Sequence, residues 1–422
     1  MHHNGAVPTP DADTPAALAR WLAGPGSAAA IEAAQEAMDS SPGDPVAAST
    51  RLRRAQPTLD PARASAALEQ VQLRQLAQSR YGLDARGLIL SRDGLEQATR
   101  PEVARYRADQ LRSAGVRRVV DLTGGLGFDC AAFAASGLEV TAVERDEATA
   151  VLLAHNCPTV TVVHADATQA GVADALIGDL APTDVVFVDP ARRDTEAPRG
   201  ANLRARPERD PSRWSPPWSW VQAITHPRVA AKVAPSFRAP SGWSAEWVSV
   251  HRTVVECAIY SWSILPTPRR ATVWVDGEVV VIDADDEPNE TRPHGPIDWM
   301  HELDPAILKA EAVGAVLRAN PELWSFDEES TWHASADEAD AVYLRSFAVI
   351  EELQGSTTSQ RRQLDRLAVD GLTVKCKDAG VAPHAVLREL DRREGNDHVL
   401  VITRRSGRTV RILCQPAPRR SA

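Results

Sequence analysis

Cysteine is scarce in this chain of 422 residues, and its five cysteines form no recognisable motif. They stand at positions 130, 157, 257, 376 and 414, with no C-x-x-C pair and no zinc-ligand spacing. We therefore predict no metal site. Reduced and mostly buried thiols are typical of the cytosol, so we expect a cytoplasmic protein.

Long apolar stretches are also missing. The sequence contains no run that is long and apolar enough to span a membrane, and its first residues do not resemble a signal peptide. We expect no association with a membrane. Residues 1–14 are polar, rich in proline and without periodicity, which predicts a disordered N-terminus.

Positive charge is in deficit, because 47 Lys and Arg face 57 Asp and Glu, for a net charge of −10. This balance argues against a protein that binds any polyanion. The charge is unevenly spread, however: residues 283–355 hold 18 acidic and 4 basic residues, whereas 356–422 hold 14 basic and 7 acidic ones. The basic segment indicates a surface for nucleic acid. Alternatively, it neutralises its acidic neighbour.

The most informative stretch is residues 119–135. An apolar run ends in Asp121, a glycine-rich turn follows, and 130–135 predicts the first turns of a helix. A strand, a tight turn and a helix begin a nucleotide-binding βαβ unit, in which glycines let the backbone approach a ligand. Such a loop alone also fits a purely structural turn.

Acidic residues follow three further predicted strands. The strands at 138–143, 160–163 and 184–188 lead to Glu144, Asp166 and Asp189. Open α/β sheets bind ligands at the carboxyl ends of their parallel strands, so the recurrence favours a cofactor site over solvated strand ends. Glu144 is placed to accept hydrogen bonds from both ribose hydroxyls of an adenosine, and Asp166 to meet an adenine edge.

This series resembles the class I S-adenosylmethionine-dependent methyltransferases. Their loop has the pattern acidic-x-Gly-x-Gly-x-Gly, and here Thr123 takes the place of the first glycine. The Gly-x-Gly-x-x-Gly pattern of dehydrogenases does not occur at 124–129. The resemblance implies an α/β fold with a Rossmann-like sheet of seven strands, and S-adenosylmethionine as cofactor. The residues expected to bind the cofactor are Asp121, Thr123, Gly124, Gly125, Gly127, Asp129, Glu144, Arg145, Asp166 and Ala167.

The predicted organisation has a helical N-terminal domain or cap (15–85) and a methyltransferase domain (86–282). Helical patterns begin after Thr14, at Ala28 and after Asp60. Strands at 246–250 and 253–262 are expected to close the seven-stranded sheet, followed by a further hairpin that turns at 276–277.

Class I methyltransferases place a segment over the cofactor just before the first strand, where this chain has Gln97, Arg105 and Arg107. By the resemblance, these side chains line the site. A surface helix capped by Thr99 is the alternative. Lys232 lies inside the predicted strand 229–235, where a lysine must be paired or face the site, and we expect it to meet the substrate.

The catalytic motif is expected at Asp189, Pro190, Arg192 and Arg193. Amino-methylating relatives carry Asp/Asn-Pro-Pro-aromatic there, and this chain lacks the aromatic residue. The motif also resembles that of RNA 5-methyluridine methyltransferases, but their cysteine nucleophile has no counterpart here. Seven arginines in 192–213 precede Trp214, Trp218 and Trp220. Either these residues bind RNA, or the tryptophans anchor a flexible loop.

Residues 283–422 resemble the α+β THUMP-like domain at the carboxyl end of a group of bacterial methyltransferases, on the strength of 299–317 and 372–415. THUMP domains bind RNA, so the resemblance implies RNA (tRNA or rRNA) as partner. We therefore predict a methyltransferase that acts on RNA. A methyltransferase for a protein or small molecule, and a non-catalytic RNA adaptor that binds S-adenosylmethionine, are the alternatives.

Overall fold

The computed structural model describes residues 14–191, 208, 210–285, 287, 295–328, 330–377 and 380–418. The chain divides into two compact units, residues 1–232 and 233–422, and each is described by itself. The predicted disordered N-terminus and the predicted catalytic residues Arg192 and Arg193 lie outside the described residues, apart from Thr14.

The first unit begins with four helices, α1 (Pro15–Ala23), α2 (Ala28–Asp39), α3 (Pro45–Ala55) and α4 (Pro61–Tyr81), with a short 3₁₀ turn between α1 and α2. Thr14 caps α1 by accepting the N–H of Ala17 at 3.2 Å, and Asp60 caps α4 in the same way. The helical patterns predicted α1, α2 and α4. The helix α3 was not predicted, and its arginines Arg51, Arg53 and Arg54 are all exposed.

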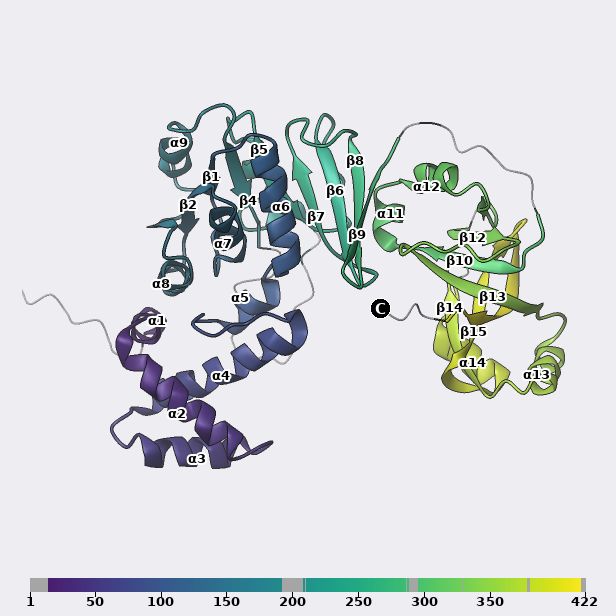
Figure 1. The fold of residues 1–422 in the computed structure, drawn as a ribbon, viewed down its shortest axis with the longest axis horizontal. Coiled ribbons are helices and arrows are strands. Elements are labelled where there is room, and N and C mark those ends of the chain that lie inside the picture. Colours follow the sequence, from purple (N-terminus) through teal and green to yellow (C-terminus); the bar gives the residue numbers. More distant parts are fainter. Residues whose placement is uncertain are drawn as a thin grey trace, which may run out of the picture. The chain divides into compact units, whose positions relative to one another are not determined.

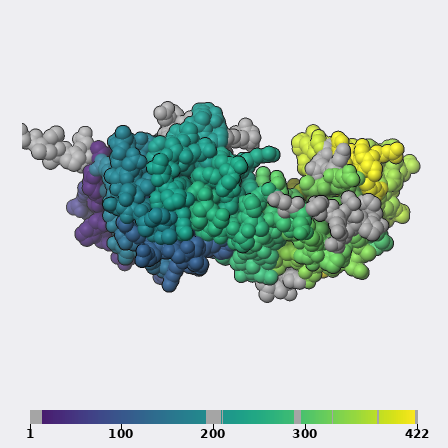
Figure 2. Space-filling view, turned by 90° about the horizontal axis from the view of Figure 1, so that it is seen from above, coloured from purple at the N-terminus to yellow at the C-terminus, as the bar shows by residue number. Residues whose placement is uncertain are grey.

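These helices pack through alanine and leucine side chains onto the rest of the first unit. Their apolar cluster includes Leu126 and Leu152, which belong to the glycine loop and to α8 (Glu147–Asn156). In Figure 1, α1 lies next to α8, whereas α2 and α3 lie further from it, and Figure 2 shows the purple N-terminal segment against the blue part of the same unit. The N-terminal helices therefore pack against the glycine loop through Leu126.

A parallel sheet forms the centre of the first unit. Its strands are β1 (Arg118–Asp121), β2 (Glu139–Glu144), β3 (Thr161–His164), β4 (Val185–Val188) and β5 (Val229–Val233), in the order β3-β2-β1-β4-β5. The predicted strands are confirmed to within two residues at each end. Because all five run in the same direction, their carboxyl ends meet at one edge of the sheet.

Five helices besides α8 accompany this sheet. They are α5 (Arg92–Gln97), α6 (Pro101–Ser113), α7 (Phe128–Ala135), α9 (Val172–Ile177) and α10 (Trp218–Gln222). In Figure 1, α6 and α7 lie close to the strands and α5 lies below them, towards α4. None of the described helices is both long and apolar enough to cross a membrane.

The second unit opens with β6 (Ser244–Val250) and β7 (Thr253–Tyr260), which pair antiparallel as predicted. The hairpin of β8 (Arg269–Val275) and β9 (Glu278–Asp283) turns at Asp276 and Gly277, both with positive φ, also as predicted. This hairpin also joins the β6–β7 pair, because β8 pairs in parallel with β6. The predicted sheet of seven strands would end with the β6–β7 pair. Instead, β6 pairs with β7 on one edge and with β8 on the other, so the strands continue through β8 to β9.

A second sheet follows, with seven strands in the order β11-β12-β10-β13-β16-β15-β14. The strands are β10 (Trp299–Leu303), β11 (Trp324–Ser325), β12 (Trp332–Ser335), β13 (Leu344–Glu352), β14 (Gly371–Cys376), β15 (Arg393–Arg405) and β16 (Arg408–Pro416). The helices are α11 (Pro305–Lys309), α12 (Val313–Ala319), α13 (Thr357–Arg366) and α14 (Pro383–Leu390).

This sheet has an apolar cluster on each face. One cluster gathers Met300, Trp332 and Phe347, and the other joins α13 and α14 to the sheet through Leu364 and Leu390. The predicted α+β character is confirmed, and β15 and β16 pair as an antiparallel hairpin. The strands β10 and β12 were not predicted, because both are short and mix tryptophan and histidine with other residues without clear alternation.

Candidate functional site

The glycine loop between β1 and α7 is shaped by close approaches of its backbone. A Cβ on Gly124 or on Gly127 would lie only 2.6 Å from a methyl group of Leu153, and Gly127 also has a φ of +88°. Gly125 differs, because a Cβ there would meet no atom nearer than 3.9 Å. The loop is thus tight against α8 at two glycines and open at the third, as a ligand-binding loop requires.

Glu144, at the end of β2, is tied to this loop. Its Oε2 accepts the N–H of Gly125 at 2.9 Å, and its Oε1 accepts the N–H of Asp146 at the same distance. Each carboxylate oxygen can accept a further hydrogen bond. The side chain is partly exposed, so the second lone pairs are available to hydroxyl groups.

Asp121, at the end of β1, is buried beneath the loop. Its Oδ1 accepts the N–H of Thr123 at 2.8 Å, and its Oδ2 accepts the thiol of Cys130 at 3.1 Å. Burial raises the pKa of Asp121 to about 7, with a further contribution from the nearby carboxylates Asp129 and Asp189. Asp121 therefore shapes the loop, and its burial favours the protonated form.

Asp166, after β3, forms a local turn. Its Oδ1 accepts the N–H of Thr168 at 2.8 Å and the hydroxyl of the same residue at 2.6 Å, and these hydrogen bonds lower the pKa of Asp166. Its neighbour Ala167 is buried, whereas Arg145 is exposed and contributes its carbonyl oxygen to a contact with His164. Of the predicted cofactor residues Arg145, Asp166 and Ala167, Asp166 is the one that presents a partly exposed carboxylate after a strand.

Asp189 follows β4 and connects the fourth strand with the glycine loop. Its backbone N–H donates to the hydroxyl of Thr123 at 2.6 Å. The next residue, Pro190, is buried, and Ala191 then pairs with Ser215 in an isolated bridge. Thr123, which replaces a glycine of the family pattern, thus positions the start of the predicted catalytic motif.

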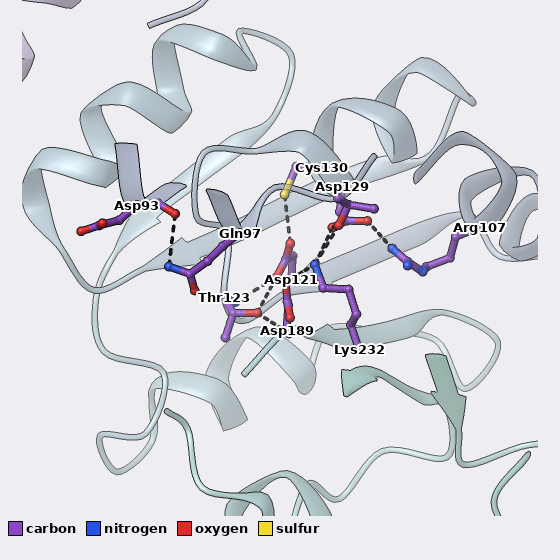
Figure 3. A network of polar contacts seen from close by, with 10 residues as sticks. Asp93, Gln97, Arg107, Asp121, Thr123, Asp129, Cys130, Asp189 and Lys232 are labelled. Carbon is purple, nitrogen blue, oxygen red and sulfur yellow. Dashed lines mark hydrogen bonds and ion pairs between the residues drawn. The ribbon is translucent and has the colours of Figure 1, made fainter. Parts of the chain in front are cut away.

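Lys232, on β5, joins two carboxylates (Figure 3). Its Nζ forms an ion pair with Asp189, lies 3.8 Å from Oδ2 of Asp129 and donates to the hydroxyl of Thr99 at 2.8 Å. The side chain of Lys232 is only 7% exposed, whereas that of Asp189 is 26% exposed. Lys232 is the paired lysine that the sequence required, and Asp189 is the more accessible partner.

Arg107, on α6, completes this network from the other side. It forms an ion pair with Asp129 and lies over the ring of Phe187. Burial alone would raise the pKa of Asp129, but the charges of Arg107 and Lys232 and the hydrogen bonds from Thr99 and Arg107 outweigh burial and lower it. Asp129 is therefore an ionised, buried carboxylate whose known partners are side chains of the protein.

The segment before β1 differs from expectation at several positions. Thr99 does not cap α6, because Arg100 occupies the N-cap position and the Thr99 hydroxyl bonds to Asp129 at 2.6 Å. Gln97 is exposed and donates to the carbonyl of Asp93, as Figure 3 shows, while Arg105 is exposed on α6. The spacing of two residues between Arg105 and Arg107 places them on different faces of the helix.

The tryptophans after the arginine-rich segment pack against the body of the unit. Trp214 and Trp218 are buried, and Nε1 of Trp214 donates to the carbonyl of Glu208 at 3.2 Å. The burial of Trp214 and Trp218 favours the alternative in which tryptophans anchor the loop, whereas Trp220 is partly exposed. Most of the arginines in question lie outside the described residues.

Comparisons with known proteins show which families and which known fold this chain is similar to. A family model described as "THUMP domain-like" matches residues 344–416, and one described as "Domain of unknown function (DUF8688)" matches residues 15–77. The chain is similar to the crystal structure of a candidate methyltransferase from Porphyromonas gingivalis W83, at 20% identity, a TM-score of 0.66, and coverage of 92% of this chain and 98% of that one. No curated protein matches the sequence.

More distant similarities extend to the N-terminal domain of human METTL16, at 15% identity over 47% of this chain and 82% of that one. The TM-score of that pair, 0.30, is too low for any inference. The match over nearly the whole chain shows a fold shared with the candidate methyltransferase from Porphyromonas, and the match of residues 344–416 agrees with the THUMP-like domain expected at the C-terminal end.

Proposed function

We propose that this protein is an S-adenosylmethionine-dependent methyltransferase that acts on RNA. The observation that carries the proposal is the acidic edge of the parallel sheet, where Asp121, Glu144, Asp166 and Asp189 stand at or just after strand ends and the neighbouring glycine loop is open at Gly125. When bound there, the cofactor would supply an activated methyl group. Glu144 would accept the ribose hydroxyls and Asp166 would meet the adenine, while the loop backbone holds the remainder.

Asp189 is the proposed catalytic residue. Its carboxylate is partly exposed beside the loop and is paired with Lys232, so it can orient an acceptor group or take a proton from it. Lys232 is buried and engaged with Thr99, Asp129 and Asp189. In this proposal Lys232 supports Asp189 and does not contact the substrate itself, in contrast to the expectation from the sequence.

The proposal of RNA as substrate is supported by the match of residues 344–416 to the THUMP domain-like family. The basic character of the C-terminal segment supports it less than its composition suggested. Six of the basic residues form ion pairs with carboxylates of the same unit, namely Arg366, Lys375, Lys377, Arg392, Arg405 and Arg411. Part of this charge therefore neutralises its acidic neighbours.

The test is methyl transfer from radiolabelled S-adenosylmethionine to total RNA and, separately, to a protein extract, both from a strain that lacks the gene. We expect label in an RNA fraction, lost with Asp189→Ala and retained with the control Asp174→Ala, an exposed aspartate on α9. Label in protein alone would establish a protein methyltransferase. Cofactor binding without transfer to either pool would favour a small-molecule substrate or the adaptor.

A further inference from the structure

A group of positive charges surrounds one carboxylate in the C-terminal sheet. Lys375 and Lys377, on and just after β14, donate from their Nζ atoms to Oε2 and Oε1 of Glu302, each at 2.7 Å. Burial would raise the pKa of Glu302, but the two lysines outweigh burial and lower it to about 2. The single ionised carboxylate of Glu302 thus forms ion pairs with the ammonium groups of both Lys375 and Lys377.

Two arginines add to this charge. Arg345 is exposed and stands directly opposite Glu302 in the pairing of β10 with β13. Arg252 donates to the backbone carbonyl of Glu302 at 2.9 Å, so its hydrogen bond there is to a neutral group. We call Arg252, Arg345, Lys375 and Lys377 the cation cluster.

Among the described residues, the cation cluster carries more positive charge than the carboxylates with which it interacts. Arg252 interacts electrostatically with Glu302, Asp304 and Arg345. Lys375 interacts with Glu302, Arg345 and Lys377. These described groups carry four positive charges and two negative ones, an excess of two. Burial lowers the pKa of Lys375, and the like charges of Arg345 and Lys377 lower it further, although Glu302 opposes both effects. A bound anion would relieve this repulsion.

Aromatic rings lie beneath the cluster. Arg345 and Lys375 lie over the ring of Phe347 at 5.4 and 5.7 Å, and Lys377 lies over Trp332 at 5.7 Å. Both rings are completely buried, so they stabilise the cations but present no face on which a nucleobase can stack. The cluster offers an anion charged donors and no base-reading surface.

We propose that the cation cluster binds the phosphate backbone of RNA, an inference that rests on the proposed RNA substrate. Guanidinium and ammonium groups are the donors that bind phosphate, and the excess charge complements a phosphodiester. Because the rings are covered, recognition here is independent of base sequence and falls as salt concentration rises.

The experiment measures binding of fluorescein-labelled bulk tRNA to the full chain by anisotropy, over a series of salt concentrations. The double variant Arg345→Ala/Lys377→Ala removes the more exposed half of the cluster. Its control, Arg362→Ala/Arg388→Ala, removes two exposed arginines from α13 and α14. We expect the cluster variant to bind about 10-fold more weakly or worse at ~0.1 M salt, with a salt slope reduced by about one to two, whereas the control binds like the wild type.

The variant Glu302→Gln is expected to gain affinity for tRNA, a result that an unfolded variant would not give. It removes the carboxylate between Lys375 and Lys377, so we expect tighter tRNA binding and a steeper dependence on salt. Thermal unfolding of each variant shows whether it is folded.

Three results would overturn the proposal: equal tRNA affinity and salt slope in the cluster variant and the wild type, an equal loss in the control, or a preference for polyglutamate over tRNA. Methyl transfer is measured separately. Cluster-dependent tRNA binding without transfer would contradict the proposed function alone, and transfer to RNA with unchanged binding in the cluster variant would contradict this proposal alone.

Discussion

Glu144 provides the sharpest test of the proposed cofactor site. Its carboxylate already accepts the N–H groups of Gly125 and Asp146, each at 2.9 Å, and has one further acceptor position on each oxygen. In Glu144→Gln one oxygen becomes an NH₂ group, which faces a backbone N–H donor and cannot accept from a ribose hydroxyl. The substitution keeps the shape of the side chain and removes its charge.

The expected loss follows from these contacts. A hydrogen bond to a charged group contributes about 1.5–3 kcal/mol, and the glutamine retains one oxygen that still accepts. We therefore expect the free energy of cofactor binding to weaken by roughly 1–3 kcal/mol, or about 5- to 150-fold in Kd.

Isothermal titration calorimetry with S-adenosylmethionine and with S-adenosylhomocysteine measures this change. The control is Glu139→Gln at the opposite end of β2, where Glu139 forms an exposed ion pair with Arg118 at 3.3 Å. We expect the control to change Kd by less than about 2-fold, as is usual for an exposed ion pair. If folded Glu144→Gln binds both ligands as tightly as the wild type, the cofactor assignment is wrong.

Two further predictions concern the support of the site and use chemical denaturation as the measurement. Gly127→Ala should lower the free energy of unfolding by roughly 2 kcal/mol or more, because its Cβ would collide with Leu153, whereas Gly137→Ala, with a similar φ but open space around it, should cost only about 1 kcal/mol. Equal losses would contradict this argument. Arg107→Met should cost about 3–5 kcal/mol at neutral pH, because it leaves the buried carboxylate of Asp129 without its arginine. The pKa of Asp129 is lowered in the folded protein, so its ion pairs stabilise the fold above the usual carboxyl pKa and lose this effect as the pH falls. The difference between variant and wild type should therefore shrink below about pH 4, and a difference that is constant with pH would count against it.

The local order of the chain could be predicted from the sequence. Each strand of the parallel sheet is a short apolar run bounded by a turn, and the acidic residues at the ends of β1 to β4 follow from the order of the residues. The Asp276–Gly277 hairpin turn follows in the same way, because its backbone requires positive φ at both residues. The glycine loop and Glu144 could also be predicted from the sequence, because a single βαβ unit contains both.

The tertiary structure alone decided which polar side chains meet. The hydrogen bond between Lys232 and Thr99 joins residues 133 positions apart, so no periodicity predicts it. Whether Arg105 or Arg107 is buried depends on which face of α6 meets Asp129, and Lys375 on β14 pairs with Glu302 on β10. Local patterns determine strands and turns because these depend on neighbouring residues. Ion pairs and the pairing of β8 with β6 depend on distances between segments that only the folded chain brings together.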